Sequence, residues 1–361
     1  MKILIIHASA GAGHTRAAQA LLQGLEGQRA HQVVLANSLD YTSQFYKKFY
    51  QDAYTFFVTK IPWAWGLFCW LTDIPFLQGL VRIVRRIFNT LTARRLADYL
   101  MNEKFDYIFS THFMAHEVAC ALKREGKIPS KIVVVVTDFD VHRIWLADSV
   151  NHYTVATPWT ARKLEVLGIP EVKILVSGIP VDKKFFEGKD IYRLKEKLGL
   201  EKDTFTVLMA TGSFGIGPIE SIVAALEDFQ LLVVCGRNKT LYDALSARRA
   251  KRHYIYGLVN NMDELMAVAD AMITKPGGLS ISEALVCCLP MIFFSAIPGQ
   301  ETHNIEVLKN YGIGASRLDT EEMVQEIKAL STHPDYLKNQ KLKIKNIARP
   351  NAVSDILSLI V

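Results

Sequence analysis

The sequence is poor in cysteine and has no long apolar run. Its five cysteines form no Cys-x-x-Cys pair and lie among apolar residues, which predicts reduced, buried thiols in a cytosolic protein. No stretch reaches the ~18 uninterrupted apolar residues that a membrane-spanning helix requires. We therefore expect a soluble or peripheral protein whose membrane contacts are made at the cytoplasmic face.

The chain also lacks a large excess of charge. Charged residues make up 22% of the 361 residues, half of the residues are hydrophobic, and the formal net charge is +6. This composition excludes a disordered chain and leaves room for two α/β domains, each with its own core. The N-terminal run MKILIIHASAGAGH is short and leads into a glycine-rich turn, which predicts a first sheet strand and not a signal peptide.

The segment 273–304 alternates strands, turns and helices. An apolar run leads into the turn Pro276-Gly277-Gly278, where the backbone can approach a ligand closely. We expect Ser280 and Ser282 to cap the next helix, whose free N–H groups and positive dipole end suit a phosphate. Glu283 is predicted to lie in the first turn of that helix, where it suits a ribose diol.

A second polar turn follows one strand later. There, Gln300 and Glu301 place an amide and a carboxylate at another helix start, and such side chains suit the hydroxyls of a sugar. A Gly-Gly turn alone favours an ordinary βαβ unit with a well-capped helix. Together the two turns, one for diphosphate and ribose and one for sugar, predict a nucleotide-sugar site.

The first predicted turn of the chain carries a histidine. Gly11 and Gly13 keep side chains away from a substrate, and His14 stands at the start of a helix expected to begin near Thr15. The helix dipole disfavours protonation of this histidine, and a neutral imidazole is what a general base needs. The alternative is a dinucleotide-type phosphate turn with an incidental histidine, but the acidic residue that usually follows the second strand is missing.

Residues 41–100 differ in composition from the rest of the chain. Aromatic residues crowd the first part, prolines interrupt it, and the stretch VRIVRRIFNTLTARR combines arginines with large apolar residues. A basic amphipathic helix beside an aromatic segment predicts contact with an anionic membrane. The alternative is a helical insertion that packs on the core with solvated arginines, whereas nucleic acid fits poorly because the arginines share their helix with apolar residues. The residues assigned to the membrane are Trp63, Trp65, Trp70, Arg82, Arg85 and Arg86.

Three motifs resemble those of a known family. TKPGGLSISEA followed by LP and PGQE, GAGHTRAA near the N-terminus, and VTDFDVHRIW between them are similar to segments of the glycosyltransferases that make glycosyl-diacylglycerols. That family, within glycosyltransferase family 28, includes monogalactosyldiacylglycerol synthases and processive diacylglycerol β-glucosyltransferases, and the lipid I N-acetylglucosaminyltransferase is a more distant relative. The resemblance covers nearly the whole chain in order. It departs at Ala12, which replaces the middle glycine of the family's GGGH turn.

The resemblance implies an α/β protein of the GT-B fold, with two Rossmann-like doubly wound domains facing across a cleft. We place an acceptor and membrane-binding domain at 1–176, with the membrane insertion at 41–100, and a UDP-sugar domain at 177–344. A terminal helix at 345–361 is expected to pack back on the first domain.

The resemblance also implies roles for single residues. His14 would be the base that deprotonates the acceptor hydroxyl. The residues expected to orient the acceptor or the base are Gly11, Gly13, His112, Asp138, His142 and Trp145. The residues expected to bind the donor are Gly212, Ser213, Phe214, Gly236, Arg237, Val259, Met262, Lys275, Pro276, Gly277, Gly278, Ser280, Glu283, Gln300, Glu301 and Asn304.

The implied reaction moves a hexose from UDP-glucose or UDP-galactose to the free hydroxyl of 1,2-diacylglycerol, inverting it to a β-glycoside. Anionic membrane lipids are expected partners, and neither a cofactor nor a metal is expected. Helix N-termini near Ser213 and Gly278, with Lys275, would meet the charge on the departing diphosphate. A metal triad of histidines lacks local ligand spacing, and the Asp-x-Asp match at Asp138 belongs to the TDF motif.

Three other functions share parts of this pattern. A transferase that moves N-acetylglucosamine to an undecaprenyl-linked lipid would share the fold and base, but PGQE and the aromatic insertion fit the diacylglycerol branch better. A UDP-N-acetylglucosamine epimerase would share the architecture without needing a membrane segment. A lipid-sensing or scaffold protein without activity would carry the donor turns only by accident.

Overall fold

The computed structural model describes residues 1–9, 11–26, 31–212, 215, 217–248, 250–294, 296–316 and 319–361, the side chains of residues 90 and 91 excepted. The chain forms two compact units. The first consists of Met1–Asp182, Ile297–His303 and Asn351–Val361, and the second of Lys183–Ala296 and Asn304–Pro350.

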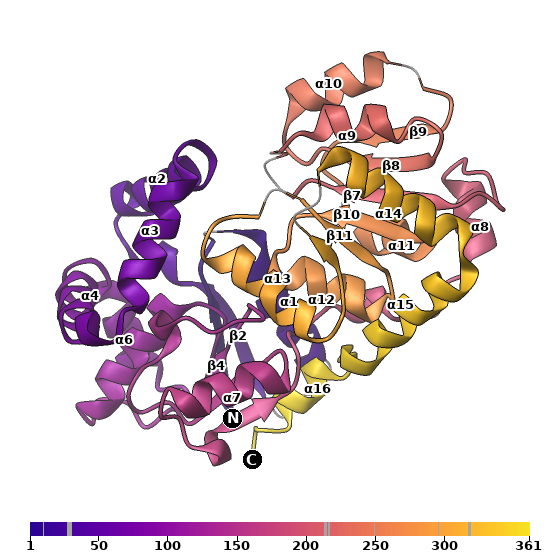
Figure 1. The fold of residues 1–361 in the computed structure, drawn as a ribbon. Coiled ribbons are helices and arrows are strands. Elements are labelled where there is room, and N and C mark those ends of the chain that lie inside the picture. The colour runs from indigo at the N-terminus through magenta and orange to yellow at the C-terminus, as the bar shows by residue number, and fades with distance from the viewer. Residues whose placement is uncertain are drawn as a thin grey trace. The chain divides into compact units, whose positions relative to one another are not determined.

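The first unit is built on a sheet of six parallel strands in the order β2-β1-β3-β4-β5-β6 (Figure 1). Alternate residues of the strands face opposite layers of helices, so both faces of the sheet are covered, as is usual for parallel strands. Ile3 and Ile5 pack with α1 (Ala12–Leu25) and α16 (Ala352–Leu357), whereas Leu4 and Ile6 face the layer that contains α5, α6 and α7. The strands are β1 (Lys2–His7), β2 (Gln32–Asn37), β3 (Tyr107–Ser110), β4 (Lys131–Val135), β5 (His152–Val155) and β6 (Ile174–Val176). The helices α5, α6 and α7 are Arg94–Glu103, Phe113–Arg124 and Pro158–Val166.

The second unit repeats this architecture with the strand order β12-β11-β10-β7-β8-β9, again all parallel. The predicted α/β class with two Rossmann-like domains is therefore confirmed. The strands are β7 (Thr206–Ala210), β8 (Gln230–Val234), β9 (His253–Tyr256), β10 (Ala271–Thr274), β11 (Met291–Phe293) and β12 (Ala315–Ser316). The helices are α8 (Ile191–Lys197), α9 (Ile219–Ala225), α10 (Lys239–Ala247), α11 (Met262–Val268), α12 (Gly278–Val286), α14 (Thr320–Thr332), α15 (Pro334–Ile347) and the part of α13 (Gln300–Asn310) that follows residue 303.

The chain passes from the first unit to the second at 182/183, where 176/177 was predicted, and returns at 350/351. The helix α15 thus belongs to the second unit, and only α16 packs on the first. Close packing at Gly24 of α1 fixes this contact, because a Cβ there would lie 2.3 Å from Cγ1 of Val353. The segment Ile297–His303 was expected in the UDP-sugar domain, yet its contacts place it in the first unit.

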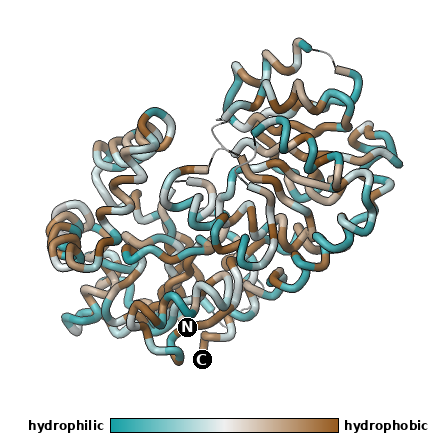
Figure 2. The backbone as a smooth tube through the Cα atoms, viewed as in Figure 1, coloured by the Kyte–Doolittle hydropathy of each residue, from teal (hydrophilic) through white to brown (hydrophobic). Residues whose placement is uncertain are grey.

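The insertion after β2 forms α2 (Gln44–Lys60), α3 (Pro62–Asp73), the 3₁₀ turn η2 (Pro75–Leu77) and α4 (Gln78–Thr92). Pro62 and Pro75 each begin a helical segment, where a missing N–H costs nothing. Figure 2 shows hydrophobic residues along the strands and again on these helices. The large apolar side chains that the insertion exposes are Phe45, Phe49, Phe56, Phe57, Trp63, Leu67, Phe68, Trp70, Leu71, Phe76, Leu80, Ile83, Val84, Ile87 and Phe88.

Within the described residues no single helix is long and apolar enough to cross a membrane. Taken together, α3 and the segment Pro75–Asn89 meet the length and composition of a span, but they are bent against each other by 76°.

Candidate active site

His14 lies in the first turn of α1. The helix begins at Ala12 with Gly11 as its N-cap, and not near Thr15 as predicted. Gly11 has no side chain that could cap this end, so the backbone N–H groups beside the imidazole keep their positive potential. Gly11 is exposed and a Cβ there would meet nothing within 4 Å.

The hydrogen bonds of His14 define its tautomer. Its Nδ1 lies 2.7 Å from the carbonyl oxygen of Thr111 and 2.9 Å from Oγ1 of Thr137. Because a carbonyl oxygen can only accept, Nδ1 carries the proton and donates it. The lone pair is then on Nε2, which makes no hydrogen bond to any described residue. Burial lowers the pKa of His14 to about 4, against the opposing effect of the Thr111 carbonyl.

Aromatic rings surround this base. The ring of His112 meets that of His14 edge-on with centroids 4.9 Å apart, and Trp145 lies 6.2 Å away. His116 stacks on Trp145 at 6.0 Å. Burial lowers the pKa of His112 well below its ordinary value and that of His116 to about 3. His112 and His116 are therefore neutral at physiological pH.

His112 and His142 both serve as helix caps. Nδ1 of His112 accepts a hydrogen bond from the backbone N–H of Met114 at the start of α6 (3.3 Å). Nδ1 of His142 accepts from the N–H of Ile144 in the 3₁₀ turn η3 (Arg143–Trp145), and its Nε2 donates to the carbonyl of Cys69 in α3 (2.9 Å). Both nitrogens of His142 are thus occupied, and the bond to Cys69 joins α3 to the loop after β4.

Asp138 follows Thr137 at the end of β4 and is buried. Its Oδ2 accepts a hydrogen bond from Nε2 of Gln300 at 2.9 Å. The neighbouring Asp140 pairs with Lys163 at 2.7 Å and with Nδ1 of His303 at 3.3 Å. The loop after β4 therefore receives the segment 297–303, and Gln300, predicted for the donor sugar, lies with the residues predicted for the acceptor.

In the second unit the predicted donor turn lies between β10 and α12. The helix starts at Gly278 with Gly277 as N-cap, and no side chain caps it. The prediction that Ser280 and Ser282 cap it was wrong, because the helix begins before them; Ser282 Oγ instead donates to the carbonyl of Gly278 (3.0 Å). The first N–H groups of α12 are thus left for another acceptor, such as an anion.

Glu283 lies in the second turn of α12, not the first, and is almost completely buried. Asn304 braces the turn before α12, because its Nδ2 donates to the carbonyl of Pro276 (3.0 Å). Lys275, between β10 and this turn, is partly buried. The start of α12, Lys275 and the turn held by Asn304 together give the carboxyl end of β10 a positive electrostatic potential.

The other predicted donor residues follow neighbouring strands of the same sheet. Gly212 and Gly236 come after β7 and β8 with φ of +72° and +61°, values that favour glycine. Because the strands are parallel, their carboxyl ends share one edge with β10. Arg237 is exposed, and Val259 and Met262, partly buried, follow β9. Ser213 and Phe214 lie outside the described residues.

The predicted membrane residues divide into two groups. Trp63 and Trp70 are 70% and 63% exposed, and Arg82 and Arg86 are exposed as well. Trp65 packs edge-on against Tyr54 at 5.3 Å. Arg85 instead bonds Oε2 of Glu117 in α6 (2.7 Å) and the carbonyl of Ile144 in η3 (3.0 Å). Arg85 therefore ties the insertion to the rest of the first unit, and Trp65 packs α3 on α2, which their spacing in the sequence did not reveal.

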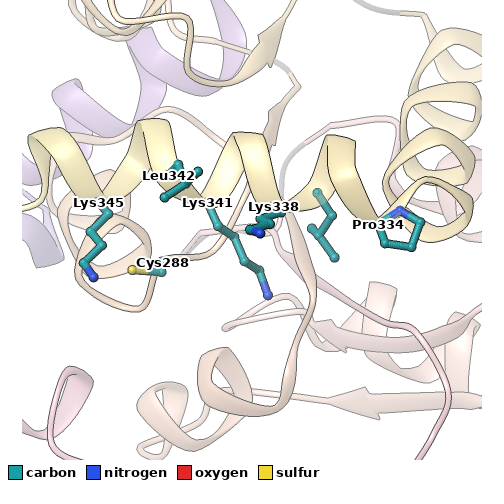
Figure 3. A pocket seen from close by; sticks show the side chains of 7 residues that line it. Cys288, Pro334, Lys338, Lys341, Leu342 and Lys345 are labelled. Carbon is teal, nitrogen blue, oxygen red and sulfur yellow. The ribbon is translucent and has the colours of Figure 1, made fainter.

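A shallow cavity of about 310 Å³ lies elsewhere in the second unit, beside α15. Lys338, Lys341 and Lys345 project from this helix on the side of Cys288 (Figure 3). It holds none of the predicted site residues. Among the described residues no three His, Cys, Asp or Glu side chains are arranged to hold a metal ion.

The sequence did not predict the hydrogen-bond acceptor that orients the His14 ring. This acceptor is the main-chain carbonyl of Thr111, and every residue has such a carbonyl, so residue type does not single it out. The only available signal was position: Thr111 follows β3, and parallel neighbours β1 and β3 bring their carboxyl ends together. The sequence also gave no signal for His116, four residues beyond His112 in α6, which stacks on Trp145.

Comparison with known proteins agrees with this architecture. Residues 14–181 match the family Monogalactosyldiacylglycerol (MGDG) synthase, and residues 216–356 match the Glycosyltransferase family 28 C-terminal domain. The processive diacylglycerol beta-glucosyltransferase of Staphylococcus carnosus (strain TM300) is 30% identical over 95% of this chain and 89% of that protein. The one from Bacillus licheniformis is 29% identical over 99% and 94%.

Solved structures share the fold at low identity. MurG of Acinetobacter baumannii has a TM-score of 0.65 at 16% identity, covering 99% of this chain and 98% of that one. The UDP-GlcNAc 2-epimerase of Neisseria meningitidis has a TM-score of 0.62 at 14% identity, covering 99% of both chains. The fold and the matched domains define a glycosyltransferase of the GT-B class. Within that class, the chain belongs to the diacylglycerol glycosyltransferase family, as the sequence motifs predicted.

Proposed function

We propose that the protein transfers a hexose from a UDP-sugar to the free hydroxyl of 1,2-diacylglycerol at a membrane surface. The observation that carries this proposal is the state of His14: neutral, oriented through Nδ1, and with the lone pair of Nε2 available. The names of the relatives support diacylglycerol as the acceptor, and the exposed apolar insertion offers a surface through which an embedded lipid would be reached.

In the proposed reaction, His14 takes the hydroxyl proton on Nε2 as the acceptor oxygen bonds to the anomeric carbon. The bond from that carbon to the UDP oxygen breaks, and its electron pair leaves with UDP. The Thr111 carbonyl accepts a hydrogen bond from Nδ1–H and stabilises the imidazolium that forms. A carboxylate performs this task in the Ser-His-Asp triad. One displacement from the face opposite UDP converts an α-linked donor into a β-glycoside.

The departing diphosphate needs positive potential. The uncapped start of α12 and the ammonium group of Lys275 would provide it without a metal ion. We assign the sugar hydroxyls to Gln300 and Glu301, and the ribose to Glu283. Since one base and fixed dipoles suffice for this chemistry, we expect activity to survive a chelator such as EDTA.

The test is UDP release from UDP-glucose and from UDP-galactose, each with vesicles that contain diacylglycerol and with vesicles that lack it. Release that requires diacylglycerol supports the proposal, and the faster donor identifies the hexose. The anomeric configuration of the product, read by NMR, tests inversion: a β-glycoside is expected and an α-glycoside contradicts the mechanism. Release without lipid, epimerisation of a UDP-sugar, or transfer only to an undecaprenyl-linked acceptor would overturn the proposal.

A further inference from the structure

Helix α3 (Pro62–Asp73) has two different faces. Trp65, Gly66, Cys69 and Asp73 recur at helical spacing and form one face, which we call the inner face. The opposite, outer face consists of apolar residues that are 40% to 70% exposed. The outer face is Trp63, Leu67, Trp70 and Leu71.

The carboxyl half of the inner face is bound to the loop after β4. The carbonyl of Cys69 accepts a hydrogen bond from Nε2 of His142 (2.9 Å). At the end of the helix, Oδ1 of Asp73 accepts from the backbone N–H of Arg143 (3.0 Å), and the carbonyl of Asp73 accepts from Nε of the same arginine (3.1 Å). These bonds fix α3 relative to the loop after β4, which also carries Thr137 and Asp138.

The middle of the inner face packs tightly on the segment 297–303. A Cβ at Gly66 would lie 2.8 Å from Cβ of Pro298, closer than real Cβ contacts come. A Cβ at Gly299 would lie 2.9 Å from Cβ of Cys69, and its φ of +88° favours glycine as well. Both segments therefore have a glycine at this contact, Gly66 in α3 and Gly299 in the segment 297–303, because neither position has room for a side chain.

The segment 297–303 is connected to His14 through hydrogen bonds of two consecutive residues. Gln300 donates to Asp138 (2.9 Å), and Thr137, the preceding residue, hydrogen-bonds His14 (2.9 Å). Glu301 is held as well, since its Oε2 accepts from the N–H of Ile297 (2.7 Å). A contiguous set of contacts thus joins the exposed outer face of α3 to the two side chains assigned to the sugar.

We propose that α3 is a positioning element for hexose transfer: its inner face sets the place of Gln300 and Glu301, and lipid at its outer face holds it there. This inference rests on the proposed function, which assigns those two residues to the donor sugar. The physical basis is that lipid removes the outer face from water, which favours the bound position of the helix. Gly66, Cys69 and Asp73 are then positioning residues that touch neither substrate.

The test is Gly66→Ala. Alanine favours a helix more than glycine does, so α3 itself is not weakened, but the added Cβ must push Pro298 away. The matched control is Gly79→Ala in α4 of the same insertion, where a Cβ would meet nothing within 4 Å. The double variant G66A/P298G removes the opposing Cβ and serves as the rescue, with Pro298→Gly alone measured beside it.

For each variant, calorimetry gives the dissociation constants of UDP and of the preferred UDP-hexose, with phosphatidylglycerol vesicles that lack diacylglycerol present or absent. For Gly66→Ala we expect unchanged vesicle binding and unchanged UDP affinity. We expect UDP-hexose affinity to fall by about fivefold, the factor that one lost hydrogen bond corresponds to. The double variant should regain it, and Gly79→Ala should match the wild type. In the wild type, vesicles should tighten UDP-hexose binding but not UDP binding.

Equal weakening of UDP and UDP-hexose, no weakening at all, or no rescue by the double variant would overturn the inference. So would vesicles that leave UDP-hexose affinity of the wild type unchanged. Failure of the proposed function is seen separately, in a wild type that transfers no hexose to diacylglycerol. Failure of the present inference is seen in the binding measurements, where Gly66→Ala is compared with Gly79→Ala and with the double variant, and the wild type with and without vesicles.

Discussion

The carbonyl oxygen of Thr111 lies 2.7 Å from Nδ1 of His14 and orients it with a main-chain atom. A backbone carbonyl does not titrate, so the base is held in one tautomer at any pH at which it is neutral. Thr111 returns a second bond, from its Oγ1 to the carbonyl of His14 (2.9 Å). The two residues therefore lock the end of β3 to the first turn of α1, and the geometry of the base follows from the pairing of β1 with β3.

Replacement of His14 by alanine should remove catalysis and spare donor binding. Loss of a general base lowers turnover by about 10²–10⁴-fold, whereas UDP affinity should stay near that of the wild type. Turnover is measured as UDP release and affinity by calorimetry. His333→Ala, at an exposed helix cap in the second unit, is the control. If His14→Ala loses both to the same extent, the histidine binds donor phosphate instead of acting as base.

The pH profile should show a base with a lowered pKa. The pKa of His14 is about 4, below its ordinary 6.5, so the imidazole is neutral and active above that value and protonated below it. We expect kcat/KM to be flat between about pH 6 and 8 and to fall on the acid side with a midpoint near 4. Initial rates in buffers of constant ionic strength test this. A midpoint between 6 and 7 would show that burial does not depress the pKa of His14.

Two arginines of α4 should have different roles: Arg85 should stabilise the fold, and Arg82 should bind anionic lipid. Arg85→Gln should lower the free energy of unfolding by about 2 kcal/mol, because it breaks charged hydrogen bonds to a largely buried Glu117. Arg82→Gln should leave stability unchanged and weaken binding to anionic vesicles by about 1 kcal/mol. Urea unfolding and vesicle sedimentation separate the two effects. Equal effects of both variants on vesicle binding would place Arg85 at the membrane after all.

Trp63 and Trp70 should anchor the protein to lipid. Replacing each by serine should weaken vesicle binding by roughly tenfold, since about 1.5 kcal/mol of apolar burial is lost. Stability should not fall, because both side chains are largely exposed. Val166→Ser is the matched control, an apolar residue 86% exposed outside the insertion. Weakening by Val166→Ser to the same degree would mean that vesicle binding is not confined to the insertion.

Acid should destabilise the fold through the buried histidines. The pKa of His116 is lowered to about 3 and that of His112 well below 6.5, chiefly by burial. A depressed pKa in the folded state means that these groups contribute stability above pH 6.5 and lose it as the pH falls toward 3. His116 adds a slope of about 1.4 kcal/mol per pH unit in that range, and His112 acts in the same direction. Urea unfolding at pH 7, 6 and 5 should show His116→Gln with a shallower slope than the wild type; an identical slope would contradict this.

The fold was predictable because its signals are local. Apolar runs such as residues 131–136, each followed by a glycine-rich or polar turn and a helix, indicate parallel strands with covered faces. Candidate site residues could be proposed for the same reason, since parallel strands bring their carboxyl ends to one edge. The predicted helix starts near Thr15 and Ser280 were wrong, because each of these helices starts two or more residues earlier, at a glycine-containing turn with no side-chain cap.

The amino-acid sequence by itself determined the family, the two parallel sheets and His14 as the candidate base, because periodicity and motif spacing are properties of neighbouring residues. Only the tertiary structure decided which partners these side chains have. It gave His14 a backbone acceptor, turned Arg85 toward Glu117, and set the segment 297–303 against the inner face of α3. The physical reason is that each of these contacts joins residues far apart in the chain, 97 positions for His14 and Thr111 and 32 for Arg85 and Glu117, and residue type does not encode which distant atoms meet.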